Sequence, residues 1–235
     1  MNGSTRHRQA ELMDQPDLAE AEHLRALAGL RRINSISRSS RLLWPDVRRL
    51  AERVRERPLR ILDVACGGGD VTVGLAQLGR RQGIELAVTG CDISPVAIGQ
   101  ARRVAAESGL TNVEFRQQDV LREPLPDGFD VVTCSLFLHH LAHDEAVELL
   151  RRMAAAARRL VLVNDLRRSR LGYWTAWGVC RLLTRSPVVR FDGPVSVAAA
   201  FTMPEALELA GRAGLSGASI SSRWPFRFVL AWSRD

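Results

Sequence analysis

Two groups of residues in this sequence could do chemistry, and the first is a glycine run. Gly67-Gly68-Gly69 follows Asp63 closely, and Asp92 comes later in the chain. Because glycine has no Cβ, a turn built from it can bend sharply and leave room for a ligand against the main chain. A carboxylate at Asp92 could hydrogen-bond both hydroxyls of a ribose. The pattern predicts a nucleoside-binding site.

The charge beside the glycines narrows the choice of nucleoside. A dinucleotide site follows the pattern G-x-G-x-x-G, whereas Gly69 is followed by Asp70, Val71 and Thr72. Asp70 places negative charge where a pyrophosphate would lie, which repels a dinucleotide but tolerates a sulfonium cation. We therefore expect a nucleoside that carries a cation rather than a pyrophosphate.

The second group is the pair His139-His140, with Asp165 further along the chain. A histidine can take the proton of a phenol of pKa ~10, and such general-base catalysis is worth roughly 10²–10⁴ in rate. His139 is our first candidate for the base, and Asp165 is the alternative base. His140 is a candidate for binding the substrate. The pair could also merely cap the following helix or contact the cofactor.

Alternating strands and helices must position these groups. Short apolar runs bounded by turn residues indicate buried strands, and 3.6-residue periodicity indicates helices. This alternation is typical of a parallel α/β sheet. Strands are predicted at 59–65, 86–91, 112–115, 129–135, 160–164, 218–222 and 226–232, and helices at 18–30, 42–57, 71–78, 95–107, 144–158, 171–183 and 201–214.

The run from Leu62 to Asp70, Leu-Asp-Val-Ala-Cys-Gly-Gly-Gly-Asp, resembles the first motif of class I S-adenosylmethionine-dependent methyltransferases. It is most similar to the ubiquinone/menaquinone biosynthesis branch, which usually has threonine in place of Gly68. Two short N-terminal stretches are also similar to small-molecule methyltransferases of type III polyketide synthase clusters. The resemblance implies a Rossmann-like α/β fold: a seven-stranded sheet in the order 3-2-1-4-5-7-6, strand 7 antiparallel, with helices on both faces.

The same resemblance implies S-adenosyl-L-methionine as the cofactor and assigns residues to it. Asp119 matches the acidic residue that accepts a hydrogen bond from the adenine amino group. His139 falls where metal-free phenolic O-methyltransferases keep their base. The cofactor-binding residues implied are Asp63, Ala65, Gly67, Gly69, Asp92, Ile93, Asp119, Val120 and Ser135.

Composition and missing motifs exclude other partners. All 33 basic residues are arginines spread along the chain, which favours a solvated surface over a nucleic-acid site. Neither the Asp/Asn-Pro-Pro-aromatic run of adenine methyltransferases nor a Pro-Cys nucleophile is present. No metal is expected, because Cys134-Ser135 supplies no carboxylate to complete a site with Asn164-Asp165. Four scattered cysteines fit a reduced, cytoplasmic setting, and we expect no signal peptide and no integral membrane segment.

The sequence outside the motifs suggests a division into parts. Residues 1–58 are expected to form an N-terminal helical lid, or else a helix pair packed on the outer sheet face, and residues 59–235 the methyltransferase domain. Residues from about 166 to 200 read as a cap-like insertion, where Trp174 and Trp177 would bind the acceptor. The helix at 171–183 is apolar on nearly every face, so it should be buried or lie in a homodimer interface.

These observations predict methyl transfer to a small aromatic or polyketide-like acceptor, with O-methylation of a hydroxyl without a metal as the first choice. One alternative is C-methylation of a quinone-type ring. The other is a catalytically silent protein that only binds the cofactor.

Overall fold

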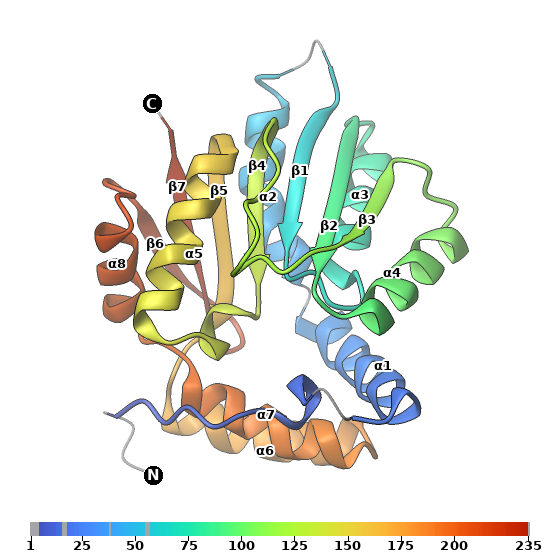
Figure 1. Ribbon diagram of the computed structural model, residues 1–235, viewed down its shortest axis with the longest axis vertical. Coiled ribbons are helices and arrows are strands. Elements are labelled where there is room, and N and C mark those ends of the chain that lie inside the picture. Colours follow the sequence, from blue (N-terminus) through green and yellow to red (C-terminus); the bar gives the residue numbers. More distant parts are fainter. Residues whose placement is uncertain (1–4, 16–17, 38, 55–56, 235) are drawn as a thin grey trace.

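The computed structural model describes residues 5–15, 18–37, 39–54 and 57–234. Its centre is a seven-stranded sheet in the order β3-β2-β1-β4-β5-β7-β6 (Figure 1). β7 is antiparallel to both β5 and β6, and the other neighbouring pairs are parallel. The predicted strand order is confirmed. The strands are β1 Leu59–Val64, β2 Leu86–Asp92, β3 Val113–Gln117, β4 Phe129–Ser135, β5 Ala157–Leu166, β6 Ser219–Arg223 and β7 Arg227–Ser233.

Helices cover both faces of the sheet because the central strands are apolar on both sides. In β1, Leu62 and Val64 pack with α5 and α8, whereas Leu59 and Ile61 pack with α2 and α3 on the other face. α4 lies beside α3 and packs against β2 and β3. This double burial is typical of parallel sheets. The helices are α2 Ser39–Ala51, α3 Asp70–Gln82, α4 Pro95–Glu107, α5 His143–Ala156 and α8 Met203–Arg212.

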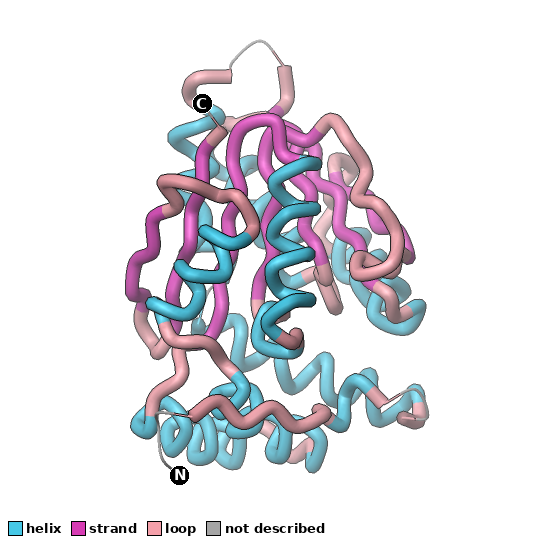
Figure 2. Tube along the Cα trace, turned by 60° about the vertical axis from the view of Figure 1, so that its left-hand side comes forward, coloured by secondary structure: helices cyan, strands magenta, loops and turns pink. Residues whose placement is uncertain are grey.

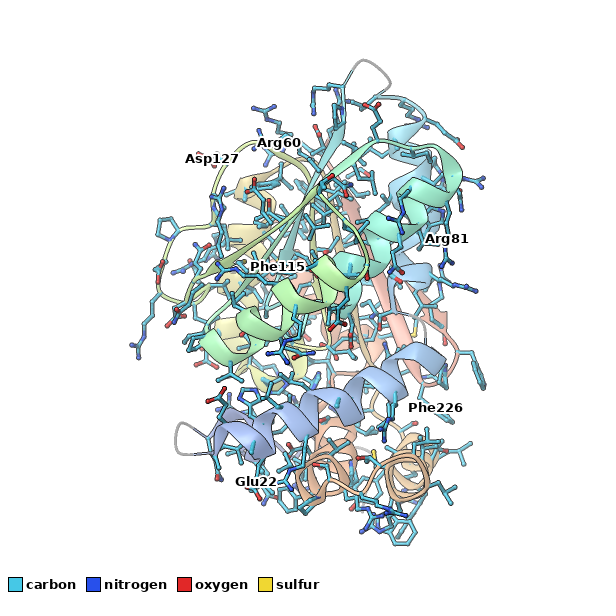
Figure 3. All side chains as sticks on the ribbon, turned by 90° about the vertical axis from the view of Figure 1, so that its right-hand side faces the viewer. Glu22, Arg60, Arg81, Phe115, Asp127 and Phe226 are labelled. Atoms are coloured by element: carbon cyan, nitrogen blue, oxygen red, sulfur yellow. The ribbon has the colours of Figure 1, made fainter. Side chains whose placement is uncertain are left out.

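A further layer lies across the carboxyl ends of the parallel strands (Figure 1; Figure 2). We call it the cover layer; it consists of the segment 5–15 with the short helix η1 Leu12–Asp14, together with α1 Glu20–Ser37, α6 Arg170–Leu183 and α7 Pro187–Ala199. Figure 3 shows α1, which carries Glu22, between the body of the molecule and the two orange helices α6 and α7. Residues 1–4, 16–17, 38 and 55–56 of the predicted N-terminal segment 1–58 lie outside the described part.

Several element predictions differ from the structure. The helix predicted at 18–30 extends to Ser37 in α1, and α7 was not predicted. The helix predicted to reach Arg57 ends at Ala51, and the Arg57 guanidinium instead forms two hydrogen bonds of 2.7 and 2.6 Å to Asp130. β5 begins at Ala157, three residues before its predicted start, because Ala157 pairs with Phe129 of β4. α6 packs against α7 and α1 and leaves several large apolar side chains exposed, so the expected burial within the chain is not observed, and a homodimer interface on this helix stays a prediction.

Candidate active site

The glycine turn joins β1 to α3 with three residues in the left-handed region. Ala65, Gly67 and Gly69 have φ angles of 53°, 52° and 81°. A Cβ added at Gly67 would meet no atom within 4 Å, whereas one at Gly69 would lie 2.9 Å from the Ala101 Cβ and 3.1 Å from the Phe115 ring. Gly67 therefore borders open space that a ligand could use. Gly69 is glycine because α4 and β3 leave no room for a side chain.

Asp63 and Asp92 hold this turn in different ways. The buried Asp63 carboxylate accepts hydrogen bonds from the hydroxyls of Thr72 (2.6 Å) and Thr133 (2.9 Å), and its burial raises the pKa of Asp63 to about 6. Asp92, half-buried at the end of β2, accepts from the backbone amides of Gly67 (2.8 Å) and Ser94 (2.9 Å). Asp63 of β1 thus links its strand to α3 and β4, while Asp92 links the glycine turn to the end of β2.

The remaining predicted cofactor residues lie after the same set of strand ends. Asp119 is half-buried and accepts from the backbone amides of Leu121 (3.0 Å) and Arg122 (3.3 Å), as an Asp in a tight turn does. Val120 is buried in the core, Ile93 is exposed, and Ser135 lies 3.5 Å from the Asn164 amide nitrogen. Their shared edge follows from the parallel pairing of β1, β2, β3 and β4.

His139 and Asp165 form a short, buried polar pair beside the glycine turn's end of the sheet. His139 lies in the short helix η2 Leu138–His140 after β4, and Asp165 lies in β5. The His139 Nδ1 atom is 2.6 Å from Oδ1 of Asp165, and the His139 backbone amide donates to Oδ2 at 3.2 Å. Both side chains are buried. The Asp165 carboxylate therefore holds both the ring and the main chain of His139. The second ring nitrogen, Nε2, remains for contacts with other groups.

Glu11 of the cover layer occupies the Nε2 side. Its Oε1 atom lies 3.6 Å from Nε2 of His139 and 3.9 Å from Nε2 of His140, and it accepts a hydrogen bond from the Ser196 hydroxyl of α7. The Arg6 guanidinium donates at 2.8 Å to the backbone carbonyl of His139. Sequence reasoning missed Glu11, since no motif surrounds it and only the fold brings it to β4.

The two carboxylates control the protonation of His139. Burial alone would lower the pKa of His139, but the charges of Asp165 and Glu11 outweigh it and raise that pKa to about 10. Burial would likewise raise the pKa values of Asp165 and Glu11, yet the histidines lower both. In this arrangement His139 is an imidazolium at neutral pH, and its Nε2 proton faces Glu11.

One set of side chains in the described part of the chain could also hold a metal ion. Ligand atoms of Glu11, His139 and His140 lie within 4.8 Å of one another. Sequence reasoning predicted no metal and did not bring these residues together. Binding would require the carboxylate and both rings to close in to about 2.0–2.2 Å from the ion, and His139 to lose its Nε2 proton.

The predicted acceptor-binding residues lie in two separate groups. His140 is half-buried, with its ring centroid 4.4 Å from that of His139 and 5.7 Å from that of Phe137. Trp174 and Trp177 are both exposed on α6 and pack edge to face, with their ring centroids 6.2 Å apart. The structure thus joins His140 to the buried cluster, and acceptor binding by the two tryptophans stays a prediction.

Comparison with known proteins agrees with this geometry. The family described as "Methyltransferase domain" matches residues 61–159. The ubiquinone biosynthesis O-methyltransferase of Pseudomonas fluorescens (strain Pf0-1) is 39% identical over 111 residues, which cover 46% of this chain and 42% of that protein. The demethylmenaquinone methyltransferase of Thermus thermophilus is 39% identical over 113 residues, covering 47% and 49%. The match thus spans less than half the length of these curated relatives.

The fold is also shared with solved structures. Magnesium protoporphyrin IX methyltransferase from Synechocystis PCC 6803, solved with bound S-adenosylhomocysteine (SAH), superposes with a TM-score of 0.58 at 20% identity and covers 95% of this chain and 91% of that one. The glycine turn, the strand order and the family match all indicate a methyltransferase fold. Residues 61–159 thus match the methyltransferase domain family, and the chain as a whole has the fold of the solved methyltransferase.

Proposed function

We propose that this protein transfers the methyl group of S-adenosylmethionine to a hydroxyl of a small aromatic or polyketide-like acceptor, without a metal and with His139 as the base. The observation that carries the proposal is the buried pair of His139 and Asp165, whose 2.6 Å contact leaves Nε2 directed at the cover layer. A base is needed because a phenol is a poor nucleophile until its proton is removed.

The residues around the glycine turn fit the cofactor. Gly67 offers main chain without a side chain, and the Asp92 carboxylate stands at the end of β2, where a ribose binds in folds of this type. The bound cofactor would supply the methyl group on a sulfonium, already attached to its leaving group. The protein then has to hold two reactants in line and exclude water.

Asp165 gives His139 its direction as a base. A carboxylate at Nδ1 keeps the proton of the neutral ring on that nitrogen, so the lone pair is on Nε2. Glu11 stands 3.6 Å from Nε2, where an acceptor hydroxyl would have to bind. The acceptor therefore takes the place of the Glu11 carboxylate, and without that charge beside it the imidazolium loses its Nε2 proton to solvent. The neutral Nε2 would then take the hydroxyl proton, while the bound cofactor would supply the methyl group.

The cover layer is proposed as the lid and the cap of this site. Glu11 comes from the N-terminal segment, and Ser196, which bonds it, comes from α7 within the expected insertion at 166–200. Two parts far apart in the sequence thus meet above His139. This supports their joint role in closing the acceptor pocket over the domain 59–235.

The proposal is tested by SAH release from the full chain with a panel of phenolic and quinol acceptors. His139→Gln should lower kcat by roughly 10²–10⁴ with unchanged cofactor affinity, whereas His140→Gln, its matched neighbour, should mainly raise the acceptor KM. Full turnover in His139→Gln would remove the base from the mechanism. Cofactor binding without SAH release would favour a silent binding protein.

C-methylation of a quinone-type ring is the second candidate, supported by the likeness to a demethylmenaquinone methyltransferase. A ring carbon attacks the methyl group first and loses its proton afterwards, so His139 would matter less to the rate of transfer. Mass and NMR analysis of the product distinguishes a methoxy group from a ring methyl and decides between the two candidates.

A further inference from the structure

The outer face of α6 presents large apolar side chains to solvent. Leu171, Trp174 and Leu182 are 67%, 63% and 85% exposed, and Trp177 is 41% exposed. At 3.6 residues per turn, positions 171, 174 and 182 share one side of the helix. Gly172 and Cys180 are buried on the opposite side. A single exposed leucine is ordinary, but a stripe of this kind indicates an interaction surface.

The charged residues next to this stripe in the sequence all have one sign. Residues 166–191 contain six arginines and neither Asp nor Glu. Arg168 is buried against Glu205, whereas Arg170, Arg181 and Arg185 are exposed. The Arg181 guanidinium lies over the Trp177 ring, 3.9 Å from its centroid. The apolar stripe is therefore flanked by positive charge.

The apolar and arginine side chains together favour one kind of binding partner for this face. A second copy of the chain would bring two arginine-rich faces together, because a two-fold interface pairs the same patch with itself. Tryptophan and leucine beside arginine suit the headgroup region of a bilayer, where indole rings and arginine side chains each keep one end apolar and one end polar. A helix in the plane of the membrane surface binds more strongly when the lipids are anionic.

We propose that the outer face of α6, formed by Leu171, Trp174, Trp177 and Leu182, docks on an anionic lipid bilayer. The helix lies on the surface; among the described residues, no helix is long and apolar enough to cross a membrane. Figure 1 places α6 in the layer across the carboxyl ends of the strands. Docking would hold that layer against lipid, where a lipophilic acceptor is concentrated, yet it requires no particular acceptor.

The two packed helices would thus make different contacts, α7 with the N-terminal segment and α6 with lipid. α7 contributes Ser196, which bonds Glu11, and Asp192, whose carboxylate accepts from the backbone amides of Leu12 (2.8 Å) and Met13 (3.1 Å). α6 contributes the apolar stripe. A surface that docks on lipid is in this way joined through one helix to the segment that covers His139.

Vesicle co-sedimentation of the full chain tests the proposal without any acceptor. The parent protein should bind phosphatidylcholine vesicles containing about 30% phosphatidylglycerol at least about tenfold more tightly than pure phosphatidylcholine vesicles. Leu171→Ser with Leu182→Ser should weaken this binding at least about tenfold. Arg181→Gln and Arg185→Gln should each weaken it roughly fivefold, since one basic residue near an anionic surface is worth about 1 kcal/mol.

The matched control is Leu207→Ser, a partly exposed leucine on α8, which should bind vesicles as the parent does. S-adenosylmethionine affinity reports whether each variant is folded. Equal binding to neutral and anionic vesicles, or no effect of the leucine pair, would overturn the proposal. So would a parent dimer in sedimentation velocity that the leucine pair dissociates, which assigns the face to a second copy. Binding to polyglutamate but not to vesicles would assign it to an acidic protein.

Discussion

The Oε1 atom of Glu11 lies 3.6 Å from the Nε2 atom of His139, on the opposite side of the ring from Asp165. The imidazole is therefore held between two carboxylates from distant parts of the chain. Asp165 belongs to the sheet, whereas Glu11 belongs to the segment that covers it. Only the second carboxylate could move away without disturbing a strand, so in the proposed mechanism Glu11 is the group that would have to leave before His139 acts as a base.

Glu11→Gln should change the pH dependence of catalysis. Burial lowers the pKa of His139, but Asp165 and Glu11 raise it to about 10, so in the parent kcat/KM should keep rising toward that pH. Removing the Glu11 charge lowers the pKa, and the ascending limb should move to lower pH. Ser196→Ala, which loses the hydrogen bond but keeps the charge, is the control and should shift the limb less. An unmoved limb in Glu11→Gln would show that another group titrates.

Asp92→Ala should weaken S-adenosylmethionine binding at least tenfold, because a charge-assisted hydrogen bond is worth about 1.5–3 kcal/mol. Isothermal titration measures the affinity. Asp127→Ala is the control, since Asp127 is exposed and lies at the far end of the sheet (Figure 3). Unchanged affinity in a folded Asp92→Ala protein would place the ribose elsewhere, and tight NAD binding by the parent would contradict the cofactor assignment.

Gly67→Ala and Gly69→Ala should fail in different ways. Both positions have positive φ, which costs an alanine about 1–2 kcal/mol. At Gly69 the new methyl group would also press on Ala101 and Phe115, so overpacking adds about 1–3 kcal/mol. The melting temperature should thus fall further for Gly69→Ala than for Gly67→Ala. Cofactor affinity should fall more than stability for Gly67→Ala, whose methyl group enters open space; the reverse ranking would mean that no ligand lies there.

Asp63 should make stability depend on pH. Its burial raises its pKa from 3.8 to about 6, so the folded state binds the proton more tightly than the unfolded state does. The resulting stabilisation is fully present below about pH 4 and is lost as pH rises through about 6, a change of up to about 3 kcal/mol. In urea unfolding, Asp63→Asn should therefore gain stability relative to the parent between pH 4 and 7. A constant difference would show that Asp63 is ionised throughout.

The sequence was sufficient for the sheet and for the part of the site that the sheet carries. Strands buried on both faces read as apolar runs, and the carboxyl ends of parallel strands share one edge, so Gly67, Asp92, His139 and Asp165 could each be assigned to this edge from the sequence. The contact between His139 and Asp165 was not predicted, because the two were treated as alternative bases. Glu11 could not be found in this way, because its position depends on how residues 5–15 cross the sheet.

The orientation of α6 was also beyond the sequence. A helix that is apolar on nearly every face has no polar side to mark the solvent, so its pattern predicts either burial or an interface and does not say which side faces outward. The structure instead turns Gly172 and Cys180 inward, where small side chains allow close packing against the β6–β7 turn and α7. The bulky side chains Leu171, Trp174 and Leu182 are left outside.

The double contact of Asp165, to the ring and to the backbone amide of His139, has a consequence for the energetics of the reaction. The imidazole cannot rotate about its side-chain torsions without losing the ring contact, and η2 cannot shift without losing the amide contact. Its orientation is therefore set when the chain folds rather than when the acceptor arrives. In the proposed reaction, proton transfer to His139 should then involve little reorganisation energy and only a small entropic barrier.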